Sequence, residues 1–186
     1  MKWFSLILIL FLCGCVSTDI QKSERISVDI QGAIYNSITN QYVPQMTQVE
    51  IHSSKEGELA NLITIYVDRY GAGRNFLYID SVHINDHILA VDKYLKWEEI
   101  AKAQNDKISK EITNVPSKYI THGLDYSFFS GNTESHYLVV DNAPSFATKG
   151  QYAIYFDKEN AIKYKNILIS FKNNKFRLKH LSDIYK

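Results

Sequence analysis

The sequence predicts a mostly β fold: one antiparallel, β-sandwich-like domain with a single helix at about residues 92–104. Apolar and polar residues alternate with a period of two in several stretches, as they do in half-buried strands. Thirteen tyrosines and nine phenylalanines suit the pleated surfaces of sheets. Turn-forming residues separate these short stretches, which is typical of sandwich architectures.

The alternation predicts individual strands along the chain. It is clearest at residues 26–30, 63–67 and 152–156, where every second side chain is apolar. Further strands are expected at residues 49–51, 76–84, 88–91 and 135–141. The order in which these strands pair cannot be read from the sequence.

Two hairpins are predicted from paired turn residues. Asn173-Asn174 suits a type I′ turn, which needs a positive φ at both central positions. Such a turn pairs Phe171 with Phe176 and places His180 on the same apolar face, as a core histidine bonded to the backbone. A second hairpin is expected to turn at Asn85-Asp86.

The segment at residues 92–104 is rich in helix formers. Asp92 can cap the amino end of a helix, and a face is formed by Tyr94, Trp97, Ile100 and Ala101. The competing interpretation is a strand with Leu95 and Trp97 pointing inward. The helix is favoured.

The amino terminus carries a targeting pattern. Lys2 precedes an apolar run from Trp3 to Leu12, which is too short to span a bilayer but has the length of a signal-peptide core. Cys13, Gly14 and Cys15 follow. This ending resembles the lipobox of bacterial lipoproteins, in which a small residue precedes the lipidated cysteine.

The resemblance implies that Cys15, preceded by the small Gly14, carries the lipid, because Leu12 before Cys13 is too bulky. Residues 1–14 are then the signal peptide, and the membrane is a partner through the lipid. Residues 15–24 are a lipidated amino terminus with a polar tether, and residues 25–186 form a single β-rich domain. Val16, which is not the aspartate of inner-membrane retention, implies the outer membrane if the source is Gram-negative.

Charge and cysteine content restrict the class of protein. The chain has 21 Lys and Arg against 20 Asp and Glu, so no basic surface for nucleic acid is expected. After processing, Cys15 would be the one cysteine left, which excludes disulfides and cysteine-ligated zinc. No cofactor motif is present, and an envelope protein is the partner that remains possible.

The segment from Asp68 to Arg74 is a candidate ligand-binding loop. Arg69 and Arg74, with Tyr70, flank two glycines that can expose backbone amides, an arrangement that suits a carboxylate or phosphate. The alternative is an ordinary loop with solvated arginines. The pattern lacks the third glycine of a dinucleotide-binding fingerprint.

The histidines do not form a recognisable catalytic or metal motif. His83 and His87 flank the expected turn at Asn85-Asp86, so their rings are predicted to point to opposite faces. The sequence has no nucleophile elbow, zinc-protease motif or phosphate loop. We therefore assign no catalytic residue and no metal ligand.

Four tyrosines occupy outward-facing positions of predicted strands, namely Tyr66, Tyr78, Tyr137 and Tyr155. Exposed, they would favour contact with a protein or a sugar. Covered by a second layer, they would be part of the core.

These observations favour a non-enzymatic binding or accessory lipoprotein of the cell envelope. One alternative is an inhibitor or immunity protein against a periplasmic hydrolase or toxin. Another is a periplasmic hydrolase that uses histidine and carboxylate residues. A pocket holding His83, His87, His122 or His136 beside an acid would favour the enzyme, whereas a flat aromatic patch would favour the binding module.

Overall fold

The computed structural model of the chain describes residues 22–53, 58–143 and 145–179. The predicted signal peptide, Cys15 with most of the tether, and His180 lie outside these residues. β1 begins at Lys22, inside the stretch expected to be tether.

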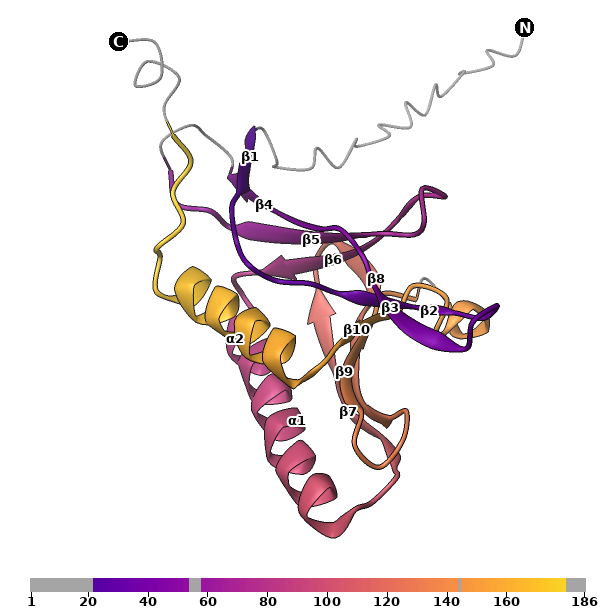
Figure 1. The fold of residues 1–186 in the computed structure, drawn as a ribbon. Helices are drawn as coiled ribbons and strands as arrows, with labels where there is room; N and C mark the ends of the chain where they lie inside the picture. Colours follow the sequence, from indigo (N-terminus) through magenta and orange to yellow (C-terminus); the bar gives the residue numbers. More distant parts are fainter. Residues whose placement is uncertain (1–21, 54–57, 144, 180–186) are drawn as a thin grey trace, which may run out of the picture.

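The described residues form two antiparallel sheets and two helices, which confirms the mostly β, sandwich-like prediction (Figure 1). The four-stranded sheet has the order β1 (Lys22–Ile26), β4 (Thr47–Ser53), β5 (Leu62–Asp68) and β6 (Arg74–Asp80). The six-stranded sheet has the order β3 (Gln41–Pro44), β2 (Ala33–Asn36), β10 (Ile154–Phe156), β9 (His136–Asp141), β8 (Ile120–Ser130) and β7 (Ser109–Ser117). The strands predicted at residues 49–51, 63–67, 76–84, 135–141 and 152–156 correspond to β4, β5, β6, β9 and β10. The strand predicted at residues 26–30 was wrong, because β1 ends at Ile26.

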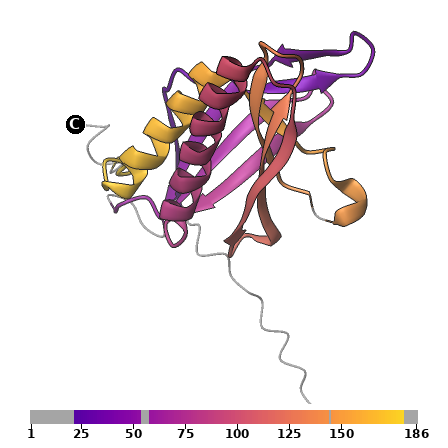
Figure 2. The ribbon, with the colours of Figure 1, turned by 90° about the horizontal axis from the view of Figure 1, so that it is seen from below.

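Both helices cover one face of the six-stranded sheet. α1 (Ile84–Gln104) contacts β7, β8 and β9, while α2 (Lys158–Lys172) contacts β9 and β10 and packs along α1. Figure 2 shows the two helices side by side on one side of the strands, with the short 3₁₀ helix η1 (Phe146–Thr148) on the other side. Buried residues of both sheets and both helices form one hydrophobic core.

The predicted helix is present but begins earlier than expected. The hairpin at Asn85-Asp86 and the strand at residues 88–91 were wrong, because both lie within α1. Ile84, His87, Val91 and Tyr94 are buried at helical spacing, so this apolar run satisfies a period of 3.6 as well as a period of two. Asp92 lies inside the helix and does not cap it.

The predicted carboxy-terminal hairpin was also wrong. Residues 167–171 belong to α2. Asp157 is the N-cap of this helix, and its side chain accepts a hydrogen bond from the Asn160 amide at 2.9 Å. Of the two asparagines, Asn174 has the positive φ, 55°. The amides of Asn174 and Lys175 donate to the carbonyls of Phe171 and Ser170, which is the hydrogen-bond pattern of a Schellman motif.

No helix within the described residues is long and apolar enough to cross a membrane.

Candidate binding face

Within the described residues, α1 and α2 leave one face of the six-stranded sheet uncovered, and the short η1 lies on that side of the strands. Strand alternation sets which residues reach it: on β8, Tyr126 and Phe128 point into the core, so Asp125, Ser127 and Phe129 point the opposite way. The register between β8 and β9 places Phe129 opposite Tyr137 and Asp125 opposite Asp141. The uncovered face therefore combines aromatic rings with a pair of carboxylates.

Five aromatic side chains gather on this face, and we name them the aromatic platform. They come from five consecutive strands of the sheet, β3, β2, β10, β9 and β8: Tyr35, Tyr42, Phe129, Tyr137 and Tyr155. Tyr35 is 42% exposed, and the others are half-buried.

Tyr42 is the centre of the aromatic platform. Its ring centroid lies 4.6 Å from that of Tyr155, 4.7 Å from Tyr137 and 5.2 Å from Tyr35. Burial, and then the neighbouring tyrosines, raise the pKa of Tyr42 to about 12, so its hydroxyl stays protonated at neutral pH. Aromatic pairs at these distances fix one another, and the platform is consequently a preformed surface.

A groove of about 350 Å³ borders one side of the aromatic platform, and we name it the carboxylate groove. Its side chains on the uncovered face are Ser109, Glu111, Asp125, Ser127, Phe129, Val139, Asp141, Lys149 and Tyr155. Lys110 also lies at the groove, but its ammonium group sits 5.2 Å from the Trp97 ring on the helix side.

Asp125 and Asp141 face each other across β8 and β9 within this groove. The Lys149 ammonium lies 3.5 Å from Asp125, and the Asn114 amide donates to Asp125 at 2.8 Å. The backbone amide of Gly150 donates to Oδ2 of Asp141. Like charges directly opposite each other destabilise a sheet, so this pair has a cost that the fold tolerates.

Asp141 is 5% exposed, and its carboxyl group is incompletely satisfied. The amide of Tyr152 lies near enough to favour the charged form, yet Oδ1 has no partner with hydrogen-bond geometry among the described residues. Burial, and then the charge of Asp125, raise the pKa of Asp141 above its ordinary value. A buried carboxyl oxygen without a donor costs about 1–3 kcal/mol, and such groups concentrate at functional sites.

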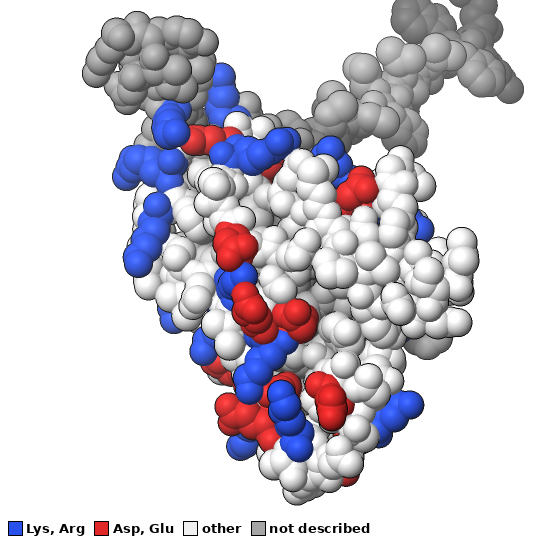
Figure 3. Space-filling view, viewed as in Figure 1, with Lys and Arg blue, Asp and Glu red and all other residues white. Residues whose placement is uncertain are grey.

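A second groove, of about 280 Å³, borders the other side of the aromatic platform, and we name it the amide groove. It is lined by Asn40, Gln41, Tyr42, Gly131, Asn132, Ser135 and Tyr137. Its polar side chains are neutral amides and hydroxyls, which both donate and accept hydrogen bonds. The surface around the β2–β3 hairpin carries few charged side chains, whereas Lys, Arg, Asp and Glu gather over α1 and α2 (Figure 3).

The four tyrosines singled out from the sequence divide between the two sheets. Tyr137 and Tyr155 belong to the aromatic platform, whereas Tyr66 and Tyr78 lie half-buried on the four-stranded sheet. The Arg74 guanidinium lies 5.8 Å from the Tyr66 ring centroid.

The loop predicted to bind a ligand connects β5 and β6 and contacts the backbone of β2. Arg69 lies 5.9 Å from the Tyr152 ring centroid, and the exposed Tyr70 hydroxyl reaches the Ile34 carbonyl at 3.5 Å. The Gly71 amide donates to Asp68 at 2.8 Å, so this acidic side chain supports the turn itself. The two arginines lie against different tyrosine rings.

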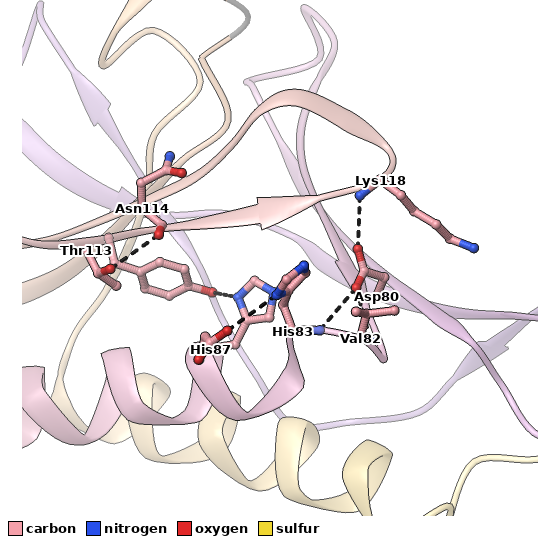
Figure 4. A network of polar contacts seen from close by, with 9 residues as sticks. Asp80, Val82, His83, His87, Thr113, Asn114 and Lys118 are labelled. Atoms are coloured by element: carbon pink, nitrogen blue, oxygen red, sulfur yellow. Dashed lines mark hydrogen bonds and ion pairs between the residues drawn. The ribbon is translucent and has the colours of Figure 1, made fainter.

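His83 and His87 lie at the start of α1 and do not flank a turn of a ribbon. Figure 4 shows Asp80 beside them, joined to the amides of Val82 and Lys118 at 3.1 Å each. His83 contacts Asp86 at 3.4 Å, while His87 is fully buried with Nδ1 2.7 Å from the Tyr126 hydroxyl.

His136 makes a serine contact that resembles part of a catalytic triad. Its Nδ1 lies 2.9 Å from Oγ of Ser130, but Ser130 and His136 are only 2% and 4% exposed. The serine already accepts the Ile108 amide at 3.1 Å. None of His83, His87, His122 and His136 lines the carboxylate groove or the amide groove.

Sequence reasoning missed Tyr35, Tyr42, Phe129, Asp125 and Asp141. Period-two alternation places Phe129 and Asp125 on one face of β8, and this signal was available at residues 124–130. The signal does not show that β2 and β10 are neighbours, which is what brings Tyr42 onto Tyr155.

Within the described residues, no group of three or more His, Cys, Asp and Glu side chains is placed to hold a metal ion. Comparisons of the chain with protein-family models, curated proteins and solved structures find no match.

Proposed function

We propose that this protein is a lipid-anchored binding module of the cell envelope, and that the uncovered face of the six-stranded sheet is its binding surface. The observation that carries the proposal is the aromatic platform, which lies between two grooves on the sheet face that α1 and α2 leave uncovered. Clustered tyrosines provide a large contact area and lose little side-chain entropy on binding.

The lipid anchor is supported by the lipobox-like sequence that ends at Cys15. Stable attachment takes at least two acyl chains, and a bacterial lipoprotein carries that number or more. A bound ligand would then be held at the membrane surface. Labelling cells with a fatty-acid probe should mark the wild type and Cys13→Ser but not Cys15→Ser; the opposite pattern would assign the anchor to Cys13.

The binding surface is tested with envelopes isolated from cells that lack the protein. The purified protein is added without its proposed signal peptide, as residues 15–186 with Cys15→Ser, so that retention depends neither on a lipid nor on the apolar run at residues 3–12. Tyr42→Ala removes the centre of the aromatic platform and should release most of the bound protein. Tyr66→Ala, a half-buried tyrosine of the other sheet, is the matched control and should be retained like the parent. Equal retention of both variants would refute this surface.

A further inference from the structure

We propose that the uncovered sheet face binds a neutral oligosaccharide, which runs from the carboxylate groove across the aromatic platform to the amide groove. This inference rests on the proposed function, because it names the ligand class of the same face. It is carried by the order of three chemically different surfaces along one sheet.

The carboxylate groove can accept hydrogen bonds from hydroxyl groups. Asp141 is buried and lines the groove, and its Oδ1 has no donor with hydrogen-bond geometry among the residues that the structure describes. Asp125 lies directly opposite, so two adjacent hydroxyls of one sugar ring could donate to the pair. Hydrogen bonds to a charged group contribute more than neutral ones, and losing one leaves a buried oxygen unpaired.

The aromatic platform lies where the apolar face of a sugar ring would stack. Its half-buried rings are fixed by their mutual contacts, from 4.6 to 5.5 Å around Tyr42. A ligand that stacks on them therefore orders no additional side chains. Beyond the platform, the side-chain oxygens of Asn40 and Asn132 already accept hydrogen bonds within the protein, which leaves their NH₂ groups to donate to ring or glycosidic oxygens. Gln41, in the same groove, can donate and accept.

The charges on this face favour a neutral ligand over a charged polymer. Glu111, Asp125 and Asp141 would repel a polyanion. A cationic side chain would have to enter beside Lys149, which already lies 3.5 Å from Asp125 in the position of a counter-ion. A polyhydroxylated ligand carries no net charge, and its hydroxyl groups can both donate hydrogen bonds to this face and accept them from it.

The test is isothermal titration of the purified full chain with Cys15→Ser, using cellohexaose, chitohexaose and maltohexaose as probes. We expect at least one of them to bind. Asp141→Asn replaces the unpaired acceptor with an amide of the same shape, and should weaken that binding about tenfold or more. Asp125→Asn, which is half-buried, should act in the same direction and guards against misfolding of the first variant.

The matched control is Asp68→Asn, since Asp68 also accepts a glycine amide but belongs to the four-stranded sheet. It should bind like the parent, and equal weakening by Asp68→Asn would overturn the assignment. Failure of all three sugars, or tighter binding of an arginine-rich peptide, would overturn it as well. If Tyr42→Ala still abolished envelope retention in that case, the binding face would stand and only the sugar ligand would be refuted.

Discussion

The buried histidine of α1 predicts a specific loss of stability in acid. His87 is fully buried, and its Nδ1 contacts the Tyr126 hydroxyl, which in turn lies 2.7 Å from the Tyr164 hydroxyl. Nε2 has no partner among the described residues. Burial is the main reason why the pKa of His87 is lowered from 6.5 to about 4. The charges of Asp80 and Asp86 act in the opposite direction and are smaller effects, while His83 lowers the pKa further.

The sign of the pH dependence follows from the lowered pKa. The unfolded chain binds a proton near pH 6.5, whereas the folded chain resists it until about pH 4. Stability is therefore complete above the unfolded pKa and is lost as the pH falls toward the folded one. Between about pH 7 and about pH 5, this one group should remove about 2 kcal/mol from the free energy of unfolding.

The assay compares urea unfolding of the wild type and of His87→Gln at both pH values. The variant lacks the titrating ring, so its loss of stability on acidification should be smaller by about 2 kcal/mol. The pKa of His52 is also lowered by burial, but its effect is common to both proteins and cancels in the difference. An identical pH response of wild type and His87→Gln would refute the assignment of a buried neutral imidazole.

Two further predictions concern packing. Phe171→Ala should destabilise the domain by about 3–5 kcal/mol in chemical denaturation, because Phe171 is 4% exposed in α2. Lys172→Ala, at an exposed position, should change the stability little. Similar denaturation midpoints for the two variants would contradict the helical packing. Gly32→Ala should cost about 1–3 kcal/mol, because its Cβ would lie 2.7 Å from Ile154 and 2.8 Å from Val67, where the two sheets meet. Gly131→Ala is the control, because the nearest contact of its Cβ would be an ordinary one at 3.5 Å. An equal loss of stability at both glycines would mean that the two sheets are not tightly packed at Gly32.

The sequence predicted the fold class and several strands because alternation is a local signal. Ile63 and Ile65 alternate with polar or aromatic neighbours, and β5 is found at that place. At Asn174 the local signal was real, since the residue does have a positive φ, but a helix end and a hairpin turn both use that conformation. Local chemistry alone could not separate the two structures.

The candidate site could be predicted only in part, because it depends on pairing between distant segments. Tyr137 and Tyr155 were recognised as outward-facing residues, and both are in the aromatic platform. Tyr42 joins them because its strand, β3, pairs with β2, and β2 pairs with β10, a strand far away in the sequence. Asp141 becomes a buried carboxylate because the segment that carries Gly150 folds over it, which no strand pattern encodes.

The central claim is that the uncovered sheet face is occupied in the envelope, and hydroxyl-radical footprinting tests it most directly. Tyr35 is 42% exposed and Tyr42 is half-buried on this face, whereas Tyr66 is half-buried on the four-stranded sheet. The wild-type protein is oxidised once in native envelopes and once after purification, and modified tyrosines are quantified by mass spectrometry. We predict that Tyr35 and Tyr42 are oxidised less in native envelopes than in the purified protein, while Tyr66 is unchanged. Equal oxidation of Tyr35 and Tyr42 in both states would contradict the claim.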